Sequence, residues 1–117
     1  MRAEIYETAK AYLGKGEESE KLQKLCQIAG EQFLARLRDE VTLEEISENF
    51  VHAAAILALS MYITMEDSGE WTSFSAGSIS VSRRNPKASA EALRFHAEEI
   101  LSRWLKDRGF YFKGVRG

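Results

Sequence analysis

One segment limits the possible folds of this chain more than any other, a strongly apolar helix predicted from Leu43 to about Met65. Thr42 and Glu45 open it as a capping box, in which the two residues exchange side-chain and backbone hydrogen bonds. From Ala53 to Leu59 every residue is apolar, so the middle of the helix has no face suited to water. Such a helix lies at the centre of a fold, with partners on several sides.

Three further segments have the apolar spacing of amphipathic helices. They run from Arg2 to Leu13, from Ser19 as N-cap to about Asp39, and from about Pro86 to Arg108. Gly30 weakens the second of these helices by about 1 kcal/mol relative to alanine, and it leaves room for a close helix contact.

The stretch between the third and fourth helices changes to a period of two. Apolar and small polar residues alternate in 71–75 and 78–82, with Ala76 and Gly77 between the two runs. This pattern predicts a β-hairpin. The sequence therefore predicts an all-α fold with a single domain over 1–117. It is a small four-helix bundle with a β-hairpin-like insertion at about 68–86 and an extended C-terminal tail at about 109–117.

Composition excludes several classes of protein. The 117 residues fit one domain, and a net charge of −2 argues against general binding to nucleic acid, which needs a basic surface. A single cysteine, Cys26, rules out an internal disulfide and fits a reducing compartment. We expect no leader peptide, and the stretch Val51–Ile63 is too short to cross a bilayer. A cytosolic protein, or part of a particle assembled in the cytosol, is predicted.

Residues that carry chemistry are few. His52 and Glu48 stand four apart on one helix and could support a metal ion or a proton relay, although solvated pairs of this kind are common. His96 has no helical neighbour that completes a metal site, and Cys26 lies on an apolar stripe that favours an inert thiol. No nucleophile with a base can be assembled. We therefore expect no enzyme activity, no cofactor and no metal.

Two segments carry large apolar side chains on an otherwise ordinary bundle, the hairpin and the last eight residues. The candidate protein-interaction residues are Trp71, Phe74, Ile79, Val81, Arg83, Arg84, Phe110, Tyr111, Phe112, Val115 and Arg116. These segments either fold back on the protein's own core or dock onto a neighbouring subunit. Residues 1–65 carry 7 basic and 11 acidic side chains, and 66–117 carry 9 and 7, so one part is acidic and the other basic. Such a division favours head-to-tail contact between copies.

A second hypothesis is a small helical regulator that binds nucleic acid. The stretch from Trp71 to Lys87 contains no acidic residue and includes Arg83, Arg84 and Lys87 beside aromatic side chains. This second hypothesis predicts salt-dependent DNA binding that disappears when these three basic residues are neutralised.

The order of the elements, the stretch Ser-Phe-Ser-Ala-Gly-Ser-Ile-Ser-Val-Ser and the ending Gly-Val-Arg-Gly resemble head–tail connector (adaptor, head-completion) proteins of phages and prophages. The resemblance covers about Thr42 to Gly117. It implies a ring of copies beneath the portal, at the virion neck, after assembly in the host cytoplasm. Such a ring receives the next neck or tail protein, and genomic DNA passes through it without specific binding. The loop 71–84 would face the lumen or a neighbour, and the tail 110–117 would reach the portal or an adjacent subunit.

Overall fold

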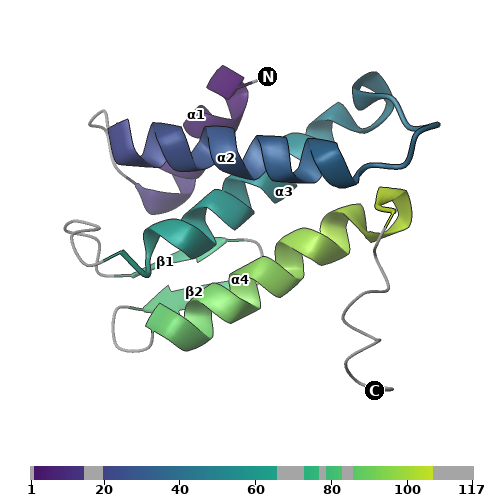
Figure 1. Cartoon of the computed structure of the whole chain (residues 1–117). Helices are drawn as coiled ribbons and strands as arrows, with labels where there is room; N and C mark the ends of the chain where they lie inside the picture. The colour runs from purple at the N-terminus through teal and green to yellow at the C-terminus, as the bar shows by residue number, and fades with distance from the viewer. Residues whose placement is uncertain (1, 15–19, 66–72, 77–78, 83–85, 107–117) are drawn as a thin grey trace, which may run out of the picture.

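The computed structural model describes residues 2–14, 20–65, 73–76, 79–82 and 86–106. Its elements are α1 (Arg2–Leu13), α2 (Glu20–Arg36), α3 (Leu43–Tyr62), β1 (Ser73–Ala76), β2 (Ile79–Ser82), α4 (Pro86–Leu101) and a 3-10 turn, η1 (Ser102–Trp104) (Figure 1). The predicted fold class is confirmed, with four helices and a two-stranded hairpin between the third and fourth. The tail at about 109–117 and the proposed N-cap Ser19 lie outside the described residues.

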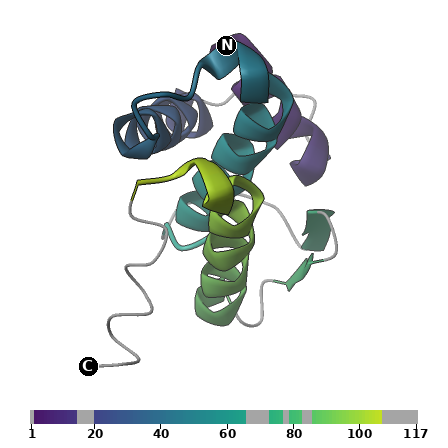
Figure 2. The same cartoon turned by 90° about the vertical axis from the view of Figure 1, so that its right-hand side faces the viewer.

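Helix α3 forms the centre of the bundle. Every residue from 53 to 60 is buried, and α1, α2 and α4 each pack against this helix from a different side (Figure 2). Four of the residues in this stretch, Ala53, Ala54, Ala55 and Ala58, are alanines, whose small side chains let the neighbouring helices approach closely. The prediction of a central helix that is apolar all round is therefore confirmed.

The start of α3 follows the sequence signal. The Glu45 carboxylate accepts hydrogen bonds from the backbone N–H of Thr42 at 3.0 Å and from the Thr42 hydroxyl at 3.1 Å. These bonds favour the charged form and lower the pKa of Glu45, with the backbone bond as the larger cause. The helix ends at Tyr62 rather than Met65, because the chain turns there through backbone bonds from Thr64 to Met61 and from Met65 to Tyr62.

Acid should remove the contribution of this cap to stability. The native pKa of Glu45 is depressed, so its stabilisation is present above the ordinary pKa of the side chain and is lost as the pH falls through the native value. We expect Glu45→Gln to lower the melting temperature slightly at pH 7. The difference from the parent protein should vanish in melting curves recorded near pH 2. If the melting temperatures of the variant and the parent differed equally at both pH values, the charged Glu45 carboxylate would not be the source of the stabilisation.

The hairpin packs on the bundle that carries it. Its antiparallel register pairs Phe74 with Val81 and Ala76 with Ile79. Ala76 and Val81 are fully buried, while Phe74 and Ile79 are partly buried against the same core. Strand β1 lies against α1 and β2 against α4, so the hairpin closes one side of the fold. This supplies the packing surface that a two-stranded hairpin needs.

Gly30 makes a close contact between α1 and α2. It is buried, and a Cβ atom built on it would lie 3.4 Å from Cδ1 of Ile5. This is the close helix approach that the sequence suggested. Alanine at this position gains about 1 kcal/mol of helix propensity, part of which the tight contact with Ile5 offsets.

We therefore expect Gly30→Ala to change the free energy of unfolding by less than about 1 kcal/mol in urea titrations. Gly30→Leu should destabilise the protein by about 1–3 kcal/mol, because the larger side chain overfills the contact. If Gly30→Ala alone lowered the free energy of unfolding by more than about 1 kcal/mol, α1 and α2 would lie closer together than the structure shows.

The far ends of α2 and α4 are joined by backbone pairing. Leu37 and Leu105 form an antiparallel bridge, in which the Arg38 N–H donates to the Trp104 carbonyl at 2.9 Å. The Lys106 N–H donates to the Arg36 carbonyl at 2.7 Å. The sequence predicted that these helices continue to Asp39 and Arg108, which is wrong. The chain leaves α4 after Leu101 and is extended at Leu105, which is only 1% exposed.

Candidate functional site

The predicted interaction residues of the hairpin are not all available to a partner. Phe74 and Ile79 are partly buried, and part of each side chain remains accessible. Val81 is only 1% exposed and belongs to the core of its own chain. Its place in the predicted interaction surface is corrected, because strand alternation turns it inward towards the bundle. Of the two options that the sequence left open, the Val81 side chain takes the first and packs on the core of its own chain.

The remaining predicted interaction residues all lie outside the described part of the chain. These are Trp71, Arg83, Arg84, Phe110, Tyr111, Phe112, Val115 and Arg116. Of the basic set put forward for nucleic acid, only Lys87 is described. It lies exposed in the first turn of α4.

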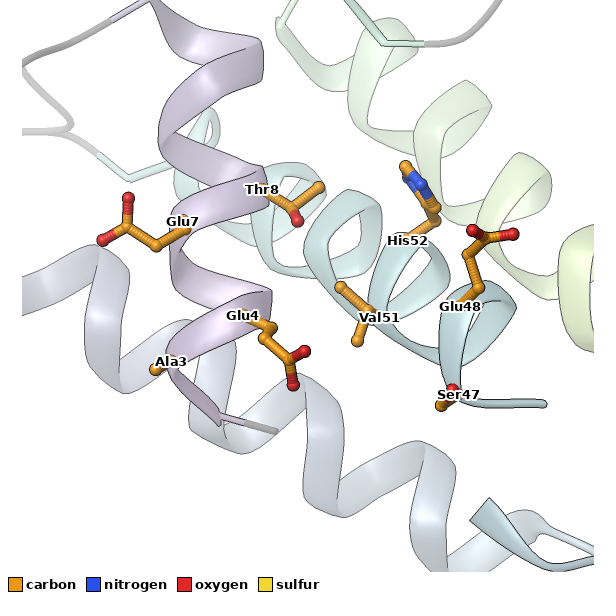
Figure 3. A pocket seen from close by; sticks show the side chains of 8 residues that line it. All are labelled: Ala3, Glu4, Glu7, Thr8, Ser47, Glu48, Val51 and His52. Carbon is orange, nitrogen blue, oxygen red and sulfur yellow. The ribbon is translucent and has the colours of Figure 1, made fainter. Parts of the chain in front are cut away.

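A groove lies between α1 and α3 among the described residues. Its volume is about 540 Å³, which is within the range of ligand sites. Both helices contribute four side chains to it (Figure 3). They are Ala3, Glu4, Glu7 and Thr8 from α1, and Ser47, Glu48, Val51 and His52 from α3. Three of the lining residues are glutamates, one is a histidine, and none is a lysine or an arginine.

His52 and Glu48 do lie together on the wall of this groove, as their spacing predicted (Figure 3). The Tyr12 hydroxyl lies 3.2 Å from Nδ1 of His52, at hydrogen-bond distance, and the two rings are tilted against each other with centroids 6.4 Å apart. Within the described ranges, no group of three or more histidine, cysteine or acidic residues could hold a metal ion. The carboxylates on the walls of the groove can attract cationic groups by charge.

A bidentate ion pair joins α2 to α4. Arg36 donates from Nη1 to Oε2 of Glu98 at 2.9 Å and from Nη2 to Oε1 at 2.6 Å. The guanidinium also lies over the Phe33 ring, 5.7 Å from its centroid. Sequence reasoning missed this pair, because its members are 62 positions apart and no local spacing signals it. It holds the two helices together beside the Leu37–Leu105 bridge.

Cys26 is buried in the core, at 2% exposure, as its place on the apolar stripe predicted. Burial raises the pKa of its thiol to about 12 from the ordinary 9.0. This difference lowers the thiolate fraction about 1,000-fold near neutral pH, since one pKa unit is a factor of ten. The environment is that of an unreactive structural thiol.

A thiol reagent should therefore label native Cys26 at least about 1,000-fold more slowly than the same chain in 6 M guanidinium. The measurement is the release of a coloured thiol at pH 8, followed in both solutions. Comparable rates in the two solutions would show that α2 opens readily or that the thiol is accessible.

Three large apolar side chains on the helices are exposed, namely Ile28 and Leu34 on α2 and Phe95 on α4. Ile28 and Leu34 are six positions apart, so they lie on different faces of α2. Single exposed apolar residues are normal on protein surfaces. No helix in the described ranges is long and apolar enough to cross a membrane.

Comparison with models of protein families, with curated protein sequences and with solved structures finds no match for this chain.

Proposed function

We propose that this protein is a structural subunit without enzymatic activity that assembles as a ring on a phage or prophage portal. In this role it is a head–tail connector and offers a docking surface for neck and tail proteins. The proposal depends on one observation, which is the hairpin seated between the third and fourth helices of a small bundle. That arrangement of elements is the one that the sequence resemblance implies.

The surface of the bundle supports an assembly role more than a catalytic one. The groove between α1 and α3 is open and acidic. The only thiol is buried and its pKa is raised, which removes it as a nucleophile at neutral pH. Part of Phe74 and Ile79 stays accessible on the hairpin, where a neighbouring subunit can reach them.

The test is sedimentation of the purified chain with the portal ring encoded in the same genome. We expect the chain to co-sediment with the portal and to form a ring on it in negatively stained images. Because weak contacts depend on concentration, the mixture is examined from 1 to about 100 times the portal concentration. No co-sedimentation at any ratio would reject the proposal.

A matched experiment separates this function from the nucleic-acid alternative. The variant Arg83→Ala/Arg84→Ala/Lys87→Ala is compared with the parent chain for binding to double-stranded DNA at low salt. The connector proposal predicts that neither protein binds DNA tightly, whereas the portal mixture contains the complex. Tight, salt-dependent DNA binding by the parent alone would favour the regulator.

A further inference from the structure

The groove between α1 and α3 combines an apolar base with acidic edges. Val51 is half-buried in its base, and it lies between the carboxylates of Glu4 and Glu48, which come from the two opposite walls (Figure 3). Glu7 adds a third carboxylate on α1, which points away from Val51 and pairs with Lys10 at 3.7 Å. This surface suits an occupant that carries both positive charge and apolar side chains.

One segment of the same sequence has that composition. Residues 108–117 contain Arg108, Lys113 and Arg116 and no acidic residue. Three aromatic residues, Phe110, Tyr111 and Phe112, stand directly before Lys113. The charges of the groove and of this segment are therefore opposite, which favours their encounter and fixes their orientation.

The start of the segment is held at a fixed place on the bundle. Leu105 and Lys106 are tied to the end of α2 by backbone hydrogen bonds, and the Arg36–Glu98 pair secures the same ends of α2 and α4. The remaining 11 residues, 107–117, extend at most about 35–40 Å beyond this point, which exceeds the diameter of about 30 Å of a small domain. That reach suffices to contact a neighbouring copy.

We infer that the groove between α1 and α3 binds the segment 110–117 of a second copy of this chain. This inference rests on the proposed ring function and names the contact that builds the ring. A contact between two different surfaces of identical chains is head-to-tail, and it closes into a ring when the rotation between copies allows it. Carboxylates at Glu4 and Glu48 attract Lys113 and Arg116, while Val51 contacts an aromatic side chain.

The size of the groove implies that each single contact is weak. A volume of about 540 Å³ holds only a few side chains, and ion pairs at an exposed rim contribute little each. Closure of a ring adds contacts that no single pair possesses, so assembly gains from several weak contacts together. Free chains should accordingly associate only at high concentration and at low salt.

The experiment reverses the charges on one side of the contact at a time in the full chain. The groove variant is Glu4→Lys/Glu48→Lys, and the segment variant is Lys113→Glu/Arg116→Glu. The control variant is Glu91→Lys/Glu99→Lys, which makes the same charge change as the groove variant at exposed positions of α4. Each protein is checked by circular dichroism, and its mass is measured by analytical ultracentrifugation over a concentration series.

We expect the groove and segment variants each to weaken self-association at least tenfold relative to the control variant. When the two are mixed, association should return, because the reversed segment of one protein then meets the reversed groove of the other. The neutral variant Glu4→Gln/Glu48→Gln replaces the groove variant if charge reversal disturbs folding. It should give an intermediate loss of self-association, because it removes the attraction without adding repulsion. This rescue by mixing distinguishes contact between copies from contact within one chain.

Two results would overturn the inference. One is that the groove variant self-associates as strongly as the control variant does. The other is a mixture that stays monomeric while the quadruple variant Glu4→Lys/Glu48→Lys/Lys113→Glu/Arg116→Glu alone regains native stability, which means that the segment binds its own groove. In either case, co-sedimentation of the parent chain with the portal would leave the proposed function standing. Rescue by mixing without portal binding would remove only the proposed function.

Discussion

Replacing Val81 by aspartate should lower the free energy of unfolding of the isolated chain by about 3–5 kcal/mol, one of the largest single effects expected in this protein. The side chain is 1% exposed, pairs across the hairpin with Phe74 and lies on the strand that packs against α4. A carboxylate there loses its water without gaining a cation. Since small domains are stable by only about 5–15 kcal/mol, urea titration should show a much earlier transition.

Ser80→Asp is the matched control for this change. Ser80 is the preceding residue of the same strand, and it is exposed on the opposite face. We expect its effect to stay within about 1 kcal/mol. If Val81→Asp instead left the isolated chain as stable as Ser80→Asp does, the side chain would be free for a partner, and the hairpin would not be part of the core.

Removing one member of the Arg36–Glu98 pair should also have a large effect. Arg36→Met leaves the Glu98 carboxylate, whose side chain is only 11% exposed, without its bidentate donor. Loss of a partner from a partly buried charged hydrogen bond costs about 1–3 kcal/mol. The measurement is the free energy of unfolding in urea, and the upper part of this range applies if water cannot reach the carboxylate.

The double variant Arg36→Met/Glu98→Met separates the interaction from the cost of an unpaired charge. An apolar pair of similar volume should restore much of the stability that Arg36→Met loses, because no charge then remains unpaired. The cycle of both single variants and the double variant should give a coupling energy of about 1–3 kcal/mol. Additive effects in this cycle would show that the two side chains do not interact in solution.

Where the sequence predictions succeeded, the signal was short-range. The central helix was predicted from an unbroken apolar run and a capping box, and both features involve residues within a few positions of one another. The hairpin was predicted from alternation over five residues on each side of Ala76 and Gly77. Local backbone preferences and periodicity decide such elements before any tertiary contact forms.

The ends of α2 and α4 show where this reasoning stops. Apolar periodicity continues past Arg36 and past Leu101, so it predicted longer helices. The bridge between Leu37 and Leu105 replaces helical hydrogen bonds with pairing between distant segments, and this pairing ends both helices. The groove has a similar origin. Glu48 and His52 were expected together from their spacing, but only the packing of α1 on α3 adds Glu4 and Glu7 to the same hollow.

The amino-acid sequence by itself determined the four helices, the capping box at Thr42 and the hairpin, because these depend on neighbours a few residues apart. Tertiary structure alone decided that Val81 belongs to the core, that Arg36 meets Glu98 and that an acidic groove forms between α1 and α3. Each of these depends on the relative placement of two elements. That placement follows from how all the apolar faces bury together, which no single stretch of sequence contains.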